Sequence, residues 1–132
     1  MEQNALVVRR FFDEVWTQGR LEVTEELLAP AHIHHLSGAD LGGPTEVKAL
    51  VAWLRSAFPD LRFVIEDEVT AGDRVVIRWT AVATHLGDYD GLPPTGRVVT
   101  WTGIDLVRLQ DHRIVELWGN YDALGLQEQL RS

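Results

Sequence analysis

The sequence predicts an α+β fold in which helices come first and a sheet follows. Up to Phe58 the apolar residues recur at helical spacing, and from Leu61 onward they alternate with polar residues as they do in strands. The helices precede the strands as a group, so the pattern excludes the βαβ succession of a nucleotide-binding fold. We expect a cone-shaped α+β barrel: three N-terminal helices packed on a curved, mainly antiparallel sheet, with an apolar interior.

Three amphipathic helices are expected before the sheet. Each ends at a residue that stops a helix, which is Gly19 for the first, Pro30 for the second and Pro59 for the third. Pro44 at a first helical position opens the third. The residues on their apolar faces are Val8, Phe12, Val15 and Trp16, then Leu21, Leu27 and Leu28, then Val47, Leu50, Val51, Leu54 and Phe58.

About four long antiparallel strands are expected after them. Residues 71–73 (Ala-Gly-Asp) form the turn between the first two, and residues 110–112 (Gln-Asp-His) connect the last two as a hairpin. The strands begin near Leu61, Arg74, Arg97 and Arg113. Residues 31–36 look extended, residues 37–43 form a glycine-containing loop, and Asp122 is expected to cap the segment 123–130.

Composition narrows the class of protein. With 132 residues the chain predicts one domain, 1–132, with a single core and a modest pocket. The net charge of −8 and the absence of any basic run disfavour nucleic acid and an anionic membrane surface as partners. The chain has no cysteine, which excludes disulfides and thiol catalysis, and its N-terminus lacks the pattern of a signal peptide. We therefore expect a cytoplasmic protein.

Asp105 is the chemically unusual residue. It lies in the apolar run Gly103 to Val107, where a charge is poorly solvated and either a partner or a shifted pKa is expected. Strand alternation places it on one face with Val99, Trp101, Gly103 and Val107. The functional interpretation is a base in an apolar pocket, and the structural alternative is an ion pair with Arg78 or Arg108.

Five stretches covering nearly the whole chain carry a family resemblance. They are VVRRFFDEVWTQGRLE, HH, GPTEVKALVAWLRSAFPDLRF, AGDRVVIRWTAVATHLGDYDGLPPTGR and IDLVRLQDHRIVELW. This succession is similar to the SnoaL-like polyketide cyclases of the nuclear-transport-factor-like superfamily. The resemblance implies a homodimer that binds a hydrophobic small molecule with neither a metal nor an organic cofactor. In the cyclases a carbon acid is deprotonated and an intramolecular aldol closure follows.

The last strand departs from the cyclase pattern. Aligned with the family, Leu117 stands at the usual histidine position and Gly119 at that of the acid/base aspartate. We therefore expect a proton-transfer-initiated tailoring step, such as hydroxylation of an aromatic polyketide, with Asp105 as the base. The alternatives are an aldol cyclase and a non-catalytic binding module. Arg78 could serve as in epoxide hydrolases of this fold, although Thr80 and Asn120 stand where that chemistry needs carboxylates.

Other polar residues complete the expected site. His35 stands at the position of a frequent family histidine and is expected to contribute a hydrogen-bonding group at the pocket. His85 is a candidate for substrate binding, and the structural alternative is that it stabilises the turn into the following loop. His32, His34 and His35 also suggest a metal, but no third ligand is evident nearby, so no metal site is expected. Asn120 and Tyr121 are candidates for hydrogen bonds to the ligand.

Aromatic residues are expected to form walls of the pocket, and a long loop is a candidate for its mouth. Of five tryptophans, at least two are expected in the core, while Trp16, Trp101 and Trp118 are expected to stack on a planar aromatic ligand. The loop 87–96 either gates the mouth or is a plain surface connection.

The long strands also predict an assembly. They carry apolar residues on both faces, whereas a sheet with one solvated face alternates cleanly. We expect a homodimer formed through the sheet.

Overall fold

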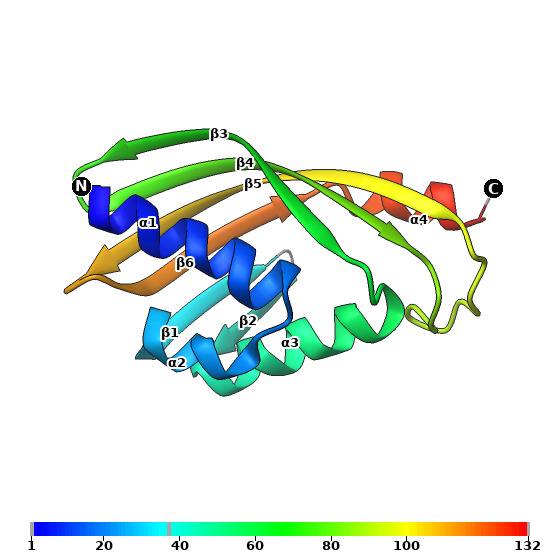
Figure 1. Ribbon diagram of the computed structural model, residues 1–132, viewed down its shortest axis with the longest axis horizontal. Helices are drawn as coiled ribbons and strands as arrows, with labels where there is room; N and C mark the ends of the chain where they lie inside the picture. Colours follow the sequence, from blue (N-terminus) through cyan, green and yellow to red (C-terminus); the bar gives the residue numbers. More distant parts are fainter. Residues whose placement is uncertain (1, 37, 132) are drawn as a thin grey trace.

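A long curved sheet with helices on its concave side makes up the computed structural model, which describes residues 2–36 and 38–131 (Figure 1). The helices are α1 (Glu2–Arg10), α2 (Thr24–Leu27), α3 (Gly43–Ala57) and α4 (Ala123–Arg131), with a π-helix at Phe11–Thr17 and a 3-10 turn at Leu21–Val23. The strands are β1 (Leu28–Leu36), β2 (Ala39–Gly42), β3 (Arg62–Ala71), β4 (Arg74–Thr84), β5 (Val98–Gln110) and β6 (Arg113–Tyr121). The predicted α+β class is confirmed.

The sheet is mainly antiparallel, in the order β2-β1-β6-β5-β4-β3. Among the strands that the structure describes, only the pair β1–β6 is parallel, and it brings the first strand beside the last. The predicted hairpin of β5 and β6 is confirmed. Its turn holds Asp111 and His112 at φ 51° and 62°, the positive values that a tight two-residue hairpin turn requires.

The helices before β1 differ from the expectation in form. The first continues from α1 into a π-helix, and the expected second helix is a 3-10 turn followed by one α-helical turn. Strand β1 begins at Leu28, so Pro30 lies inside a strand instead of beyond a helix. An irregularity in the β1–β6 pairing between Leu28 and Ile33 accommodates this proline, which has no N–H to donate.

Two further segments complete the comparison with the sequence. The expected loop 37–43 contains the short strand β2, which pairs with β1 through Leu41 and His34; Ser37 itself lies outside the described residues. Asp122 caps α4 as expected, because its Oδ1 accepts a hydrogen bond of 2.9 Å from the N–H of Gly125.

Alternation along β5 separates an inner face from an outer one. Val99, Trp101, Gly103, Asp105 and Val107 are buried on the concave side, as predicted, while the residues between them point outward. In the sheet β5 lies between β6 and β4, and α4 packs against it, while α1 packs on β3, β4 and β6 and α3 packs on β1 and β2 (Figure 1).

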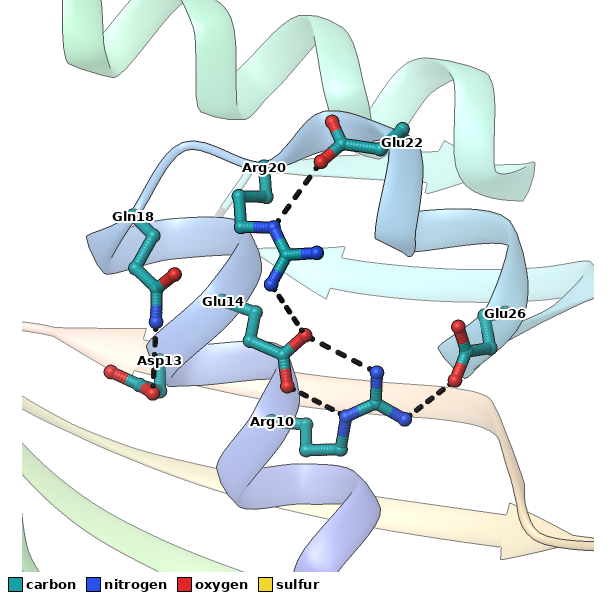
Figure 2. A network of polar contacts seen from close by, with 7 residues as sticks. All are labelled: Arg10, Asp13, Glu14, Gln18, Arg20, Glu22 and Glu26. Carbon is teal, nitrogen blue, oxygen red and sulfur yellow. Dashed lines mark hydrogen bonds and ion pairs between the residues drawn. The ribbon is translucent and has the colours of Figure 1, made fainter.

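An ion-pair network joins the π-helix to the segment that follows it (Figure 2). The Arg10 guanidinium contacts Glu14 at 2.7 Å and Glu26 at 2.6 Å, and Arg20 contacts Glu14 at 3.3 Å. These side chains lie on the solvent side of the helix, away from its buried aromatic residues. Exposed pairs each contribute less than about 1 kcal/mol, so their main effect is on orientation.

Among the described residues, no helix combines the length and the apolar character needed to cross a membrane.

Candidate functional site

The concave side of the sheet and the helices against it enclose an apolar cavity. Its walls come from the π-helix, β1, α3, the four long strands, the loop before β5 and α4. The aromatic residues that line it are Phe12, Trp16, Trp53, Phe63, Trp79, Tyr89, Trp101 and Tyr121. A cavity with so many aromatic faces and few polar groups suits a planar, apolar ligand.

Asp105 is the carboxylic acid of this cavity. It lies on the wall formed by β5 and is only 9% exposed. Burial raises its pKa from 3.8 to about 7, because the charged form loses its hydration, and the hydrogen bond from the Trp79 indole opposes part of this rise. The Trp79 Nε1 donates to Asp105 Oδ1 at 3.1 Å. At neutral pH the group is therefore divided between acid and base.

Two glycines make room for this pair. A Cβ on Gly103, which pairs with Trp79 across β4 and β5, would collide with the indole ring. A Cβ on Gly119, which pairs with Asp105 across β5 and β6, would lie 3.0 Å from Asp105 Oδ1. The carboxyl group and its indole partner occupy the space that side chains at these two positions would fill.

The π-helix supplies the opposite wall. Phe12 and Trp16 reach the cavity from it, and both rings pack on Phe63, whose ring centroid lies 4.8 Å from that of Trp79. The Arg55 guanidinium of α3 holds the end of the π-helix by donating to the carbonyls of Trp16 and Thr17, each at 2.9 Å. This contact ties Trp16 to α3.

Residues near the ends of the strands complete the cavity. Tyr89 comes from the loop 87–96, and burial raises its pKa, with a further contribution from Tyr121. Trp53 of α3 packs against Tyr89 with a ring separation of 5.4 Å and remains 46% exposed, so it lies where the cavity meets solvent. The loop thus contributes to the wall, and its base is held to α3 by the N–H groups of Leu86 and Gly87, both bonded to the Ala57 carbonyl at 3.0 Å.

Comparison with known proteins identifies the family. The family model described as SnoaL-like polyketide cyclase matches residues 6–130. The chain belongs to the SnoaL-like polyketide cyclase family. It is 31% identical over 129 residues to the aklanonic acid methyl ester cyclase DnrD of Streptomyces peucetius, covering 94% of this chain and 88% of DnrD.

Two solved structures extend this relationship. A proposed SnoaL-like polyketide cyclase from Jannaschia sp. CCS1 superimposes with a TM-score of 0.92 at 28% identity, covering 99% of this chain and 93% of that one. AclR of Streptomyces galilaeus, a proposed hydroxylase, superimposes with a TM-score of 0.89 at 25% identity, covering 99% and 97%. The family resemblance inferred from the sequence is confirmed, and the family includes proteins assigned to different reactions.

Five of the residues predicted from the sequence to form the site do line the cavity. They are Asp105, Trp16, Trp101, Asn120 and Tyr121. Asp105 is not paired with either of the arginines proposed as structural partners: Arg78 binds Asp67 at 2.7 Å, and Arg108 binds Glu116 at 3.0 Å.

His35 and Trp118 do not lie on the cavity. His35 is held by Glu116 at 2.7 Å and Asp40 at 2.9 Å on the outer face of the sheet, and its ring stacks on Trp118 at 5.3 Å. The expectation that they contact the ligand is corrected, because strand alternation turns both away from the interior.

Arg78 and His85 are also placed elsewhere. Arg78 lies on the outer face of β4, half exposed, in its pair with Asp67. His85 is buried at the end of β4, where its Nδ1 accepts from the N–H of Thr95 at 3.2 Å and its ring packs on Phe58. It stabilises the start of the loop, which is the structural role given above as the alternative to substrate binding.

Several lining residues were not assigned to the site from the sequence, among them His34, Trp53, Trp79 and Tyr89. For Trp79, the sequence did contain a signal: it pairs with Gly103 across the two strands. A bulky ring opposite a glycine indicates that the ring fills the space which a side chain at the glycine would occupy. His34 differs from the expected His35 by one residue, which is the shift that reverses a strand's faces.

Proposed function

We propose that the protein is a cofactor-independent enzyme that takes a proton from a hydrophobic polycyclic substrate of aromatic polyketide type and thereby starts a hydroxylation or another tailoring step. The observation that carries the proposal is Asp105, an ionisable carboxyl group in a cavity otherwise lined mainly by aromatic and aliphatic residues. In this reaction Asp105 is the general base, and the aromatic walls bind and orient the substrate.

The raised pKa suits this role. A phenol has a pKa of about 10, so an ordinary aspartate is about 6 units too weak to accept its proton easily. Burial raises the pKa of Asp105 to about 7. The difference in pKa between the phenol and Asp105 then falls to about 3 units, which makes the proton transfer about 4 kcal/mol less unfavourable. At neutral pH a fraction of the molecules still carries Asp105 in its ionised form.

Gly119 favours hydroxylation over aldol closure. It faces Asp105 from β6, and a Cβ there would already approach the carboxylate to 3.0 Å. This part of the cavity therefore carries one carboxyl group, so in an aldol closure Asp105 would have to both remove the carbon-bound proton and return it to the oxyanion, and Gly119 adds no second acid to share these two steps. In the hydroxylation, the substrate's O–H or C–H bond breaks and its proton passes to Asp105. The anion transfers two electrons to dioxygen, the oxidant, as a C–O bond forms; the resulting peroxide takes the proton back, and its O–O bond breaks with loss of water, which leaves one oxygen on an oxidised, quinone-type product.

Aldol cyclisation is the second candidate, supported by the relationship to DnrD. The third is a binding module without catalysis. These functions differ in what they consume: hydroxylation takes up dioxygen, cyclisation does not, and a binding module leaves the ligand unchanged.

The test is proton exchange at a carbon acid, which reports the first step alone. Anthrone in D₂O should exchange its methylene hydrogens faster with the wild-type protein, with a rate that rises through pH 7 as Asp105 ionises. Asp105→Asn should reduce this exchange by about 10²–10⁴-fold. Affinity for anthrone, followed by tryptophan fluorescence, should stay similar because the amide keeps the shape of the carboxyl group.

Asp67→Asn is the matched control, since Asp67 is a strand carboxylate on the outer face. It should leave the exchange rate unchanged. Full exchange activity in Asp105→Asn would exclude Asp105 as the base, and a wild-type exchange rate no faster than that in buffer would put the binding module ahead. Dioxygen uptake measured with the same compound separates hydroxylation from cyclisation.

A further inference from the structure

Two buried histidines of β1 play no part in the proton transfer proposed above. His32 is fully buried, and His34, which lines the cavity, is 3% exposed. The His32 Nε2 and the His34 Nδ1 lie 3.1 Å apart, so one of them must donate a proton to the other. Burial lowers the pKa of His32 to about 4 and that of His34 to about 3, so both rings are neutral at physiological pH.

The surroundings of His32 decide the direction of this hydrogen bond. Its other ring nitrogen, Nδ1, is buried without a hydrogen bond of good geometry, and the polar group that favours a proton on this ring is the backbone carbonyl of Ile114. Because Nε2 faces His34, Nδ1 is the nitrogen that we infer to carry the proton favoured by the Ile114 backbone. His32 Nε2 is then the acceptor, and His34 donates from Nδ1.

The tautomer of His34 follows from this arrangement. A neutral imidazole carries one proton, and on His34 that proton is on Nδ1. Its Nε2 is therefore a lone pair, and it is the ring nitrogen left to meet a molecule in the cavity. The ring is held in place by the contact with His32 and by the edge of Phe11, whose ring centroid is 6.4 Å away.

We propose that His34 is a further ligand-binding residue, whose Nε2 accepts a hydrogen bond from a hydroxyl group of the bound molecule, and that His32 is the positioning residue that fixes its tautomer. This inference rests on the proposed function and adds a chemical requirement to its substrate. The ligand must carry a hydroxyl donor at a position other than the one that Asp105 deprotonates.

The sheet separates these two positions. His34 pairs with Leu117 and Asp105 pairs with Gly119, so β6 lies between their strands. Two strand spacings put the two backbones about 10 Å apart, so the two side chains start from different parts of the cavity wall. The site therefore fits a planar polycyclic phenol or enol with polar groups on different rings.

The tautomer can be measured directly in the unmodified protein. In ¹⁵N-labelled protein, His34 should show an unprotonated Nε2 and a protonated Nδ1 in long-range ¹H–¹⁵N correlation spectra. Adding 2-naphthol should shift the Nε2 resonance toward lower frequency as it accepts a hydrogen bond. 2-Methoxynaphthalene, which has the same rings but no donor, should bind without this shift.

Variants test the contribution to binding. His34→Phe keeps a ring but removes the acceptor, so it should weaken 2-naphthol by about ten-fold and leave 2-methoxynaphthalene nearly unchanged. His32→Leu should weaken 2-naphthol in part. His32→Gln should restore its affinity, because the amide oxygen can accept from His34 Nδ1. Only a role through the tautomer predicts this rescue.

Each other outcome overturns the inference. A proton on His34 Nε2, or equal shifts with both probes, would show that His34 is not an acceptor for the ligand. If 2-naphthol quenches tryptophan fluorescence but leaves His34 unperturbed, His34 has no role in binding while the role of Asp105 still stands. If neither probe binds, the aromatic ligand class fails and the proposed function fails with it.

Discussion

The two faces of the sheet treat neighbouring residues in opposite ways. His34 and His35 are adjacent in β1, yet burial lowers the pKa of His34 to about 3, while the carboxylates of Glu116 and Asp40 raise the pKa of His35. Burial raises the pKa of Asp105 on the inside, whereas His35 and Arg108 lower that of Glu116 on the outside. The charged groups on the outer face have partners and water, whereas burial shifts the pKa of each inner group toward its neutral form at the expense of stability. That contrast is the reason why we propose the inner groups as the functional ones.

The largest expected effect is loss of stability in acid. The folded-state pKa values of His32 and His34 lie below the ordinary 6.5. Below pH 6.5 the unfolded chain therefore binds more protons than the folded chain, and the free energy of unfolding decreases as the pH is lowered. Between pH 6.5 and 4.5 the two groups together should destabilise the fold by about 5 kcal/mol. Urea unfolding of the wild type and of His34→Gln measures this, and the variant should lose about half of the slope. Equal slopes would contradict buried neutral histidines.

Asp105→Asn should stabilise the protein above neutral pH. The folded-state pKa of Asp105 is raised to about 7, so the folded chain binds the extra proton and stability falls as pH rises from about 4 to 7. The variant escapes this loss and should gain up to about 4 kcal/mol at pH 8, with no gain at pH 4. Thermal unfolding at both pH values provides the measurement. Asp67→Asn, on the outer face, should show no such gain.

Gly103→Ala should disturb the inner face without changing the outer one. The added methyl group displaces the Trp79 indole, which should cost about 1–3 kcal/mol of stability. Loss of the indole hydrogen bond should raise the pKa of Asp105 further, because that bond favours the carboxylate. Carboxyl ¹³C titration by NMR reports the shift. Gly42→Ala is the control, since a Cβ there meets nothing closer than 4.0 Å; an unchanged Asp105 titration in Gly103→Ala would contradict the account.

The homodimer proposed from the strand pattern concerns the outer face. Ile104 is 52% exposed there, in the middle of β5. Ile104→Glu should shift the mass in light scattering from dimer to monomer at micromolar concentration, because a buried unpaired carboxylate opposes association. Leu6→Glu, at an equally exposed apolar residue on α1, should not. A wild-type mass that is monomeric at every concentration would exclude the dimer.

The smallest effect is expected for Glu116→Gln. Glu116 is partly exposed and joins His35 to Arg108 on the outer face. Its removal should bring the pKa of His35 back toward the ordinary value while proton exchange at anthrone stays unchanged. NMR titration of His35 checks the first part. A lower exchange rate would show that the outer network supports the site.

Much of the fold was predictable because helical and strand periods are local properties. Asp105 and Trp101 could be assigned to one inner face, since β5 alternates without interruption past them. The run HIHH in β1 offers a histidine to either face, and the side is decided by pairing with β6 after an irregularity near Pro30. The neighbours of one strand, far away in the sequence, determine such a choice, so local reasoning selected His35 where the cavity has His34.

The π-helix at Phe11–Thr17 also has a consequence for chain length. A π turn holds one residue more than an α turn, so the segment contains a surplus residue that the helix absorbs. Deleting one residue here and restoring α geometry would leave Arg55 and the chain after it in place, but would rotate α1 by about 100° around its axis. Val8 would turn away from the core and Arg9 away from Glu68, its partner at 2.8 Å. The segment is thus the place where a homologue one residue shorter should differ, with the sheet unchanged and the wall that Phe12 and Trp16 form altered.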